Sequence, residues 1–133
     1  MKYAKEQMDN DPRLRLMSLS LDPGHDTPQV LSNWANAHQI KSDDWWFLTG
    51  EEDKLQKLAD GIGFEKTIIV PPDERQSEGD IFRHDMRIAL IDSDNQIREF
   101  YDVMSESSKV AEASQQRLLN DLKVILGKSN ASE

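Results

Sequence analysis

The chain has 133 residues, of which 25 are acidic and 16 are basic, and its formal net charge is −9. The length suits one domain with a modest core. A duplex-binding surface needs clustered Lys and Arg, so this charge argues against nucleic acid and against direct docking on an anionic membrane. The sequence contains no cysteine, which excludes disulfides and thiol chemistry. It also lacks an apolar run near the roughly 20 residues of a membrane span, and we expect a soluble chain without a signal peptide.

A strand followed by a capped helix is predicted in the first third of the chain, after a short helix end over residues 1–8. Apolar residues over 14–21 favour a strand, and the Asp-Pro-Gly turn at 22–24 ends it, because Pro fixes φ and Gly accepts positive φ. Asp26 or Thr27 can cap a helix over about 28–39. The predicted apolar face of that helix comprises Val30, Leu31, Trp34 and Ala37.

The middle of the chain predicts a second strand and a second helix. The aromatic run at 43–48 suits a strand. Thr49 and Glu52 have the spacing of a capping box before a helix, which Gly61 and Gly63 would end. Residues 66–70 suit a short strand, and the charged stretch from 71 to 80 suits an exposed loop. The apolar positions of this helix are Leu55, Leu58, Ala59 and Ile62.

A hairpin and a long helix are predicted for the last third. Residues 88–91 are apolar throughout, as in a strand that is covered on both faces, and 97–101 return antiparallel after a turn at 93–95. The final helix is expected over about 107–126, before a frayed tail at 129–133. Its apolar stripe includes Leu118, Leu122, Ile125 and Leu126, and Gly127 ends it.

Three segments occur in the order found in one known family. Asp22-Pro23-x-x-Asp26-Thr27-Pro28 follows a strand, Leu48-Thr49-Gly50 follows a tryptophan-rich strand, and His84 precedes Ile88-Ala89-Leu90-Ile91-Asp92. In these segments the chain resembles the Sco/SenC family, which are thioredoxin-fold copper chaperones for cytochrome oxidase assembly. The resemblance extends to about residue 127.

The resemblance implies an α/β fold, a thioredoxin-like three-layer sandwich of the peroxiredoxin/Sco type, as a single domain over 1–128 with a disordered tail at 129–133. The family's Cys-x-x-x-Cys pair and the central strand before it have no counterpart here, so we expect a domain that is incomplete at its N-terminus. That strand would separate the parallel pair (14–21 and 45–49) from the hairpin (87–92 and 96–101). Its loss predicts a marginal or rearranged fold, or a homodimer in which a second copy fills the gap.

The resemblance also implies that His84 is a copper ligand, beside two cysteines that this chain does not have. From residue type alone, a single histidine before a strand is more often a surface or hydrogen-bonded residue. Met86 is a soft donor that could add weak Cu(I) binding, and on a strand it would share a face with His84. The alternative is that Met86 fills the core. Without thiolates, we expect no tight copper binding.

Two other groups of residues have a structural and a functional interpretation. Asp22, His25 and Asp26 include metal-ligand types, but a turn and a helix cap explain them better. Trp34 suits the core, whereas one of Trp45 and Trp46 should lie on the opposite strand face as a contact surface. We identify no catalytic residue.

The function implied by resemblance is copper delivery to an oxidase subunit, in the periplasm or at a membrane, with a thiol redox role in the full-length family. This chain is not expected to be an enzyme, because thiol peroxidases and disulfide reductases need cysteine. The alternatives are a metal-free, thioredoxin-like module that binds a protein partner, and a truncated product without a function of its own.

Overall fold

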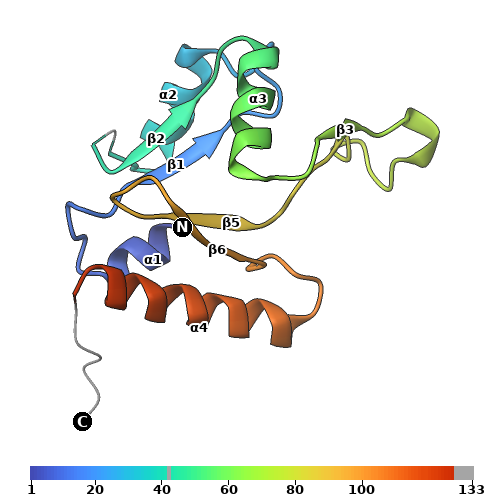
Figure 1. The fold of residues 1–133 in the computed structure, drawn as a ribbon. Coiled ribbons are helices and arrows are strands. Elements are labelled where there is room, and N and C mark those ends of the chain that lie inside the picture. Colours follow the sequence, from blue (N-terminus) through green and yellow to red (C-terminus); the bar gives the residue numbers. More distant parts are fainter. Residues whose placement is uncertain (42, 128–133) are drawn as a thin grey trace. The chain divides into compact units, whose positions relative to one another are not determined.

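The structure of the protein is a computed structural model, which describes residues 1–41 and 43–127 (Figure 1). The predicted tail at 129–133 lies outside these residues. The chain divides into two compact units, one formed by Arg15–Asp85 and the other by Met1–Leu14 with Met86–Glu133. The prediction of a single domain over 1–128 stays a prediction. In chain order the elements are α1 (Lys2–Gln7), β1 (Leu16–Leu19), α2 (Pro28–Ala37), β2 (Trp45–Leu48), α3 (Glu52–Ile62), β3 (Ile68–Ile69), the 3₁₀ helix η1 (Pro72–Glu74), β4 (Phe82–Arg83), β5 (Ile88–Ile91), β6 (Ile97–Tyr101) and α4 (Ser108–Ile125).

The unit Arg15–Asp85 begins with a parallel pair of strands joined through a helix. β1 pairs with β2 from Leu16 opposite Trp45 to Leu19 opposite Leu48. α2 begins after Thr27, whose side-chain oxygen accepts a hydrogen bond from the Val30 amide, and Pro28 takes the first helical position. The predicted cap and helix are therefore confirmed, although the strand is shorter than the predicted 14–21.

α3 begins differently from the prediction. Its N-cap is Glu51, which makes no side-chain capping bond, so the capping box of Thr49 and Glu52 is wrong. Among the described residues, the buried Thr49 hydroxyl has no hydrogen-bond partner. Acidic residues in the first turn still oppose the positive end of the helix dipole. Gly63 ends the helix in the left-handed conformation, at φ 95°, as expected of a C-terminal glycine.

The apolar faces of both helices in this unit stay largely open. Neither α2 nor α3, which are described in full, contains a buried residue. Trp34 on α2 is 45% exposed, so its predicted place in the core is wrong. A pair of strands with four residues each offers too narrow a surface to cover a helix on either face.

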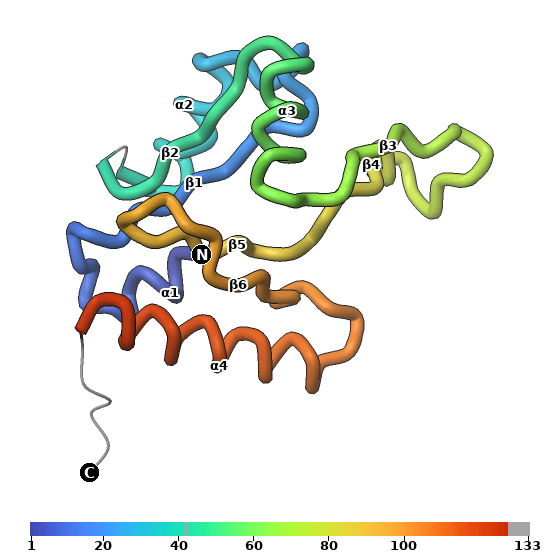
Figure 2. Tube along the Cα trace, viewed as in Figure 1, coloured from blue at the N-terminus to red at the C-terminus, as the bar shows by residue number. Residues whose placement is uncertain are grey.

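A small antiparallel pair continues the same unit. β3 and β4 pair Ile68 with Arg83 and Ile69 with Phe82, and the chain between them is drawn as a long excursion (Figure 2). This excursion is mostly exposed, as predicted for 71–80, and it contains η1. The Arg75 guanidinium donates to the carbonyl of the buried Val70 at 3.0 Å, which fixes one end of it.

The other unit contains the predicted hairpin. β5 and β6 pair Ile88 with Tyr101, and a bulge lies at Leu90/Ile91. The Asp92 carboxylate closes the turn, accepting the amides of Asp94 (2.8 Å) and Gln96 (2.9 Å) and pairing with Arg98. The hydrogen bond from Gln96 is the main reason why the pKa of Asp92 lies below its usual value.

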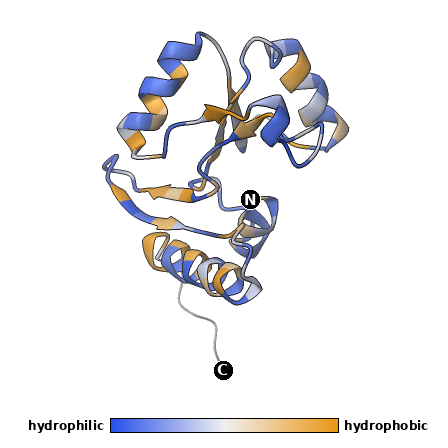
Figure 3. Cartoon of the chain, turned by 90° about the vertical axis from the view of Figure 1, so that its right-hand side faces the viewer, coloured by the Kyte–Doolittle hydropathy of each residue, from blue (hydrophilic) through white to orange (hydrophobic). Residues whose placement is uncertain are grey.

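One hydrophobic core joins α1, the hairpin and α4 in this unit. Apolar and polar residues share α4, and its apolar side supplies three core residues (Figure 3). Ile91 on β5 is 44% exposed, so the prediction that both faces of this strand are covered is wrong. The helices α1 and α4 supply apolar side chains to the core cluster, which contains Leu90 of β5 but not Ile91. Ile125 of the predicted stripe is likewise exposed. The core cluster contains Ala4, Met8, Leu90, Tyr101, Leu118, Leu119 and Leu122.

A buried lysine fixes the segment after α1. Lys5 donates through Nζ to the carbonyl oxygens of Asp11 (2.9 Å) and Leu14. Arg13 pairs with the Asp11 carboxylate and donates to the Leu126 carbonyl at 2.9 Å. The bonds of Lys5 compensate the cost of burying its ammonium group. The bond from Arg13 to Leu126 holds the segment 8–14 at the end of α4.

The sheets in the described residues are three separate pairs: β1 with β2, β3 with β4, and β5 with β6. The mixed α/β class is confirmed. The parallel pair and the hairpin belong to different sheets. The continuous sheet of a three-layer sandwich is not formed by these residues, since no described strand bridges the pairs.

Replacing Leu122 by alanine tests the core of this unit. Leu122 is buried in the cluster, and we expect Leu122→Ala to lower the free energy of unfolding by about 2–4 kcal/mol through lost contacts and a cavity. Urea denaturation followed by circular dichroism measures the loss. Val124→Ala on the same helix is the control, since Val124 is 73% exposed and should change stability by less than about 0.5 kcal/mol. Equal effects of the two variants would contradict this core.

Tyr101 makes stability sensitive to alkaline pH. Its buried hydroxyl donates to Asp121 at 2.5 Å, and burial, then Asp121, raises the pKa of Tyr101 far above its usual value of about 10. The neutral form is favoured in the folded state, so its stabilisation is complete below about pH 10 and is lost above it. Tyr101→Phe should cost about 1–2 kcal/mol at neutral pH and flatten the alkaline loss. Urea denaturation at several pH values, with the exposed Tyr3→Phe as control, measures both effects.

Candidate metal site

His84 lies in the connection between β4 and β5, outside any strand, and is half-buried. Its Nδ1 is 2.8 Å from the carbonyl oxygen of Asp85. A carbonyl oxygen can only accept, so Nδ1–H is the donor in this contact, and in the neutral ring the lone pair is then on Nε2. This is the tautomer in which Nε2 can bind a metal ion while Nδ1–H donates to a backbone carbonyl.

The residue after His84 is itself anchored. The Asp85 carboxylate accepts the backbone N–H of Glu65 at 2.9 Å, which connects the His84 segment to the residues that follow α3. The sequence carries no signal for this contact, because its donor is a backbone amide 20 positions away and any residue type at 65 except proline supplies one.

Met86 differs from the sequence-based expectations in its secondary structure and in its burial. Residues 84–87 belong to no strand, so the predicted common strand face with His84 is wrong. Met86 is 45% exposed, which excludes the role of core filler. Its thioether is accessible to a soft ion, and its role as a ligand stays a prediction.

The donor set around His84 is incomplete as a metal site. Within residues 1–41 and 43–127, no group of three or more His, Cys, Asp or Glu side chains could hold a metal ion. The whole chain also lacks the thiolates that Cu(I) prefers. The geometry therefore fits one imidazole ligand of copper and does not supply the rest of a coordination sphere.

The cluster of Asp22, His25 and Asp26 forms a turn before α2. The Asp26 carboxylate accepts the Ser20 hydroxyl at 2.6 Å, and the Asp22 carbonyl accepts the amides of His25 and Asp26. The His25 ring lies 3.7 Å from the other oxygen of Asp26 and is largely exposed. These contacts support the structural interpretation, with Thr27 rather than Asp26 as the helix cap.

The aromatic residues of this unit make contacts on both faces of β2. Trp34 stacks on His38 with centroids 4.1 Å apart and meets Phe47 edge-on at 5.5 Å. The Trp45 indole donates to the Ser18 hydroxyl at 3.0 Å, whereas Trp46 is 41% exposed under the Arg15 guanidinium. The prediction that one of the two neighbouring tryptophans is an exposed residue is confirmed for Trp46.

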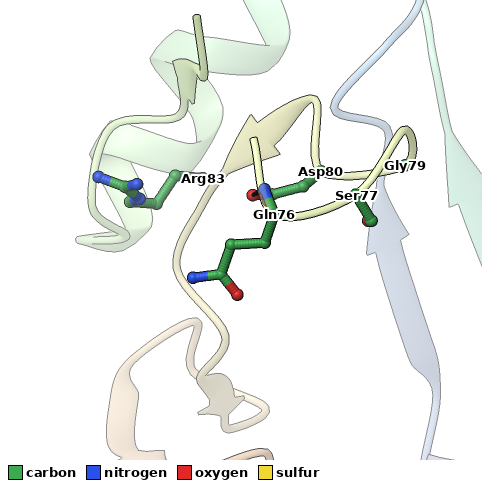
Figure 4. A pocket seen from close by; sticks show the side chains of 5 residues that line it. All are labelled: Gln76, Ser77, Gly79, Asp80 and Arg83. Atoms are coloured by element: carbon green, nitrogen blue, oxygen red, sulfur yellow. Dashed lines mark hydrogen bonds between the residues drawn. The ribbon is translucent and has the colours of Figure 1, made fainter. Parts of the chain in front are cut away.

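A polar hollow lies in the excursion between β3 and β4. Figure 4 shows its lining side chains, and the Asp80 carboxylate accepts a hydrogen bond from the backbone N–H of Gln76 at 3.2 Å. No site residue predicted from the sequence lines it. The lining consists of Gln76, Ser77, Gly79, Asp80 and Arg83. Ligand pockets are usually lined by apolar and aromatic side chains, so this hollow does not qualify as one.

The family model described as SCO1/SenC matches residues 1–119. The chain belongs to the SCO1/SenC family. The match contains all three segments on which the resemblance was based, and it confirms that part of the sequence analysis. A comparison with curated proteins found no match.

Solved structures of two relatives share the fold. One is ScoI of Bradyrhizobium japonicum with copper bound, which is 18% identical; the match covers 85% of this chain and 68% of that one, with a TM-score of 0.59. The other is a SCO1/SenC family lipoprotein from Bacillus anthracis strain Ames, 17% identical, with 94% and 67% covered and a TM-score of 0.64. The described part of this chain has the thioredoxin-like fold of these proteins, and its sheets are two-stranded. None of its described helices is both long and apolar enough to cross a bilayer.

Replacing Asp26 tests the structural interpretation of the turn before α2. Asp26→Ala removes the acceptor of the Ser20 hydroxyl, and we expect a loss of about 1 kcal/mol in the free energy of unfolding, measured by urea denaturation. The exposed Asp43→Ala is the control and should change little. Unchanged stability together with weaker binding of Zn²⁺ or Cu²⁺ would instead favour a metal site at this turn.

Proposed function

We propose that this chain acts in copper handling as a SCO1/SenC-type copper chaperone, with His84 as its imidazole ligand. The observation that carries the proposal is the Nδ1–H···O=C bond of His84, because it leaves Nε2 as the metal-binding nitrogen. Membership of the SCO1/SenC family and the copper-bound structure of ScoI support copper as the cargo.

Copper is held here by an incomplete set of donors. Imidazole suits copper, and the exposed thioether of Met86 adds a weak, soft donor for Cu(I). Because the 133 residues contain no cysteine, any thiolates of the copper site come from outside this sequence. The chain alone therefore binds copper weakly, and its contribution is one nitrogen ligand in a fixed tautomer.

The proposed partner is an oxidase subunit that receives copper during cytochrome oxidase assembly. The proposed location is the periplasm or a membrane surface, and the relative that is a lipoprotein supports the membrane. The role is that of a chaperone rather than an enzyme, since a chain without cysteine has no thiol for peroxidase or disulfide-reductase chemistry. A homodimer through the open sheet edges is the alternative to a monomer.

The exposed indoles favour a second candidate, a metal-free module that binds a protein partner. Trp34 and Trp46 both expose more than two fifths of their surface, and exposed aromatic residues are common in protein interfaces. This candidate predicts that Trp46→Ala weakens capture of the oxidase subunit and leaves copper binding unchanged. Capture that is lost in His84→Ala and unchanged in Trp46→Ala would contradict it.

Copper titration of the chain tests the first candidate. Under anaerobic conditions, competition with a chromophoric Cu(I) chelator should show no tight one-to-one binding. For Cu²⁺, electron paramagnetic resonance should show a nitrogen-coordinated signal. His84→Ala should raise the apparent dissociation constant about tenfold, which corresponds to about 1.4 kcal/mol.

His38→Ala is the matched control for this titration. The Nδ1 of His38 also lies 2.8 Å from a backbone carbonyl, that of Trp34, so the two histidines present the same tautomer at different places. Copper binding that survives His84→Ala and is lost in His38→Ala would overturn the proposed role of His84. Tight Cu(I) binding abolished by His84→Ala would show that the chain needs no external thiolates.

A further inference from the structure

We propose that Asp85 is a positioning residue that holds His84 in its metal-binding tautomer. The inference rests on the proposed copper-handling function and concerns the same site. Two atoms of Asp85 act together: its carbonyl oxygen accepts Nδ1–H of His84, and its carboxylate accepts the amide of Glu65.

The carboxylate bond fixes the direction of the carbonyl. Residues 84–87 belong to no strand, so the regular hydrogen bonds of a ladder do not set their backbone dihedrals. Asp85 is half-buried, and its Oδ2 atom lies 2.9 Å from the Glu65 nitrogen, just beyond the C-terminus of α3. With the side chain tied to that backbone, the Asp85 carbonyl keeps the 2.8 Å contact to the imidazole.

The tautomer determines which nitrogen can meet a metal ion. A free neutral imidazole exchanges its proton between Nδ1 and Nε2, and copper binds only the nitrogen that lacks it. A backbone acceptor at Nδ1 keeps the proton there and the lone pair at Nε2. Loss of the Asp85 anchor frees the carbonyl, mixes the two tautomers and lowers the fraction of His84 that is ready to bind through Nε2.

His38 serves as an internal reference in the same molecule. Its Nδ1–H donates to the Trp34 carbonyl, which belongs to the last turns of α2 and is held by the helix rather than by a carboxylate. A change at Asp85 should therefore leave the tautomer of His38 intact, so the two histidines separate a local effect from general unfolding.

Nuclear magnetic resonance of the imidazole nitrogens tests the proposal without copper. At about pH 8.5, where imidazoles are neutral, long-range ¹H–¹⁵N spectra report which nitrogen is protonated. We expect Nδ1–H for His84 in the wild type, a mixture in Asp85→Ala, and the wild-type pattern in Asp85→Asn, which keeps an oxygen acceptor for Glu65. His38 should be Nδ1–H in all three.

Asp80→Ala is the matched control, because it removes another carboxylate that accepts a backbone amide, that of Gln76, in the same unit. It should leave His84 unchanged. An unchanged tautomer in Asp85→Ala, or an equal change in Asp80→Ala, would overturn the proposal. If Asp85→Ala unfolds and the reference signal of His38 is lost, Asp85→Glu is the second variant. It lengthens the side chain by one methylene, and we expect the same mixture of tautomers for His84. A wild-type pattern of His84 in Asp85→Glu would count against the proposal.

Copper affinity measured in the same variants separates this inference from the function on which it rests. Asp85→Ala should weaken the apparent affinity about twofold to fivefold, less than the loss of the imidazole in His84→Ala, because the apparent affinity scales with the fraction of His84 in the binding tautomer. Asp85→Asn should restore it. A shifted tautomer with copper affinity that is insensitive to His84→Ala would refute the function and leave the positioning role standing. An unchanged tautomer in Asp85→Ala, together with copper binding that depends on His84, would refute the positioning role and leave the proposed function standing.

Discussion

The width of the sheets is the constraint on which this structure depends. Each sheet of the described residues has two strands, and a pair of four-residue strands covers little of a packed helix. The unit with α4 overcomes this limit because α1 and α4 enclose the hairpin residues in one core. In the described part of the unit Arg15–Asp85 the sheets are the pairs β1–β2 and β3–β4, and both helices, α2 and α3, stay open. The stability of the chain is therefore unequally distributed between its units.

Local chemistry in the sequence predicted the elements well. The strand at 45–48, the helix capped by Thr27, the stop at Gly63 and the long helix before Gly127 follow from turn and cap residues that act within a few positions. The capping box at Thr49 failed because Glu51, and not Thr49, is the N-cap of α3, which spacing alone does not reveal. Burial was harder to predict: Trp34 and Ile91 are apolar but exposed, since burial depends on covering elements that a periodic pattern does not identify.

At the candidate site, too, the sequence identifies single residues but not the contacts between residues that are far apart in the chain. His84 was selected by resemblance, and its environment explains how its tautomer suits a metal ion. The sequence placed Met86 beside it on a strand, whereas the chain has no strand there. The anchor from Asp85 to Glu65 joins a side chain to a backbone amide, and such a contact leaves no trace in residue type. The resemblance to the family thus explains why His84 is the candidate ligand, and the bond from Asp85 to Glu65 explains how its segment is held.

The distribution of aromatic residues has a practical consequence. All three tryptophans of the chain, at 34, 45 and 46, lie in the unit Arg15–Asp85, and both tyrosines, at 3 and 101, lie in the other unit. Indole fluorescence therefore reports on the parallel strands and the open helices, while the near-ultraviolet signal of tyrosine reports on the hairpin core. The molecule carries one optical probe for each half, so the order in which the halves melt can be followed without adding a label.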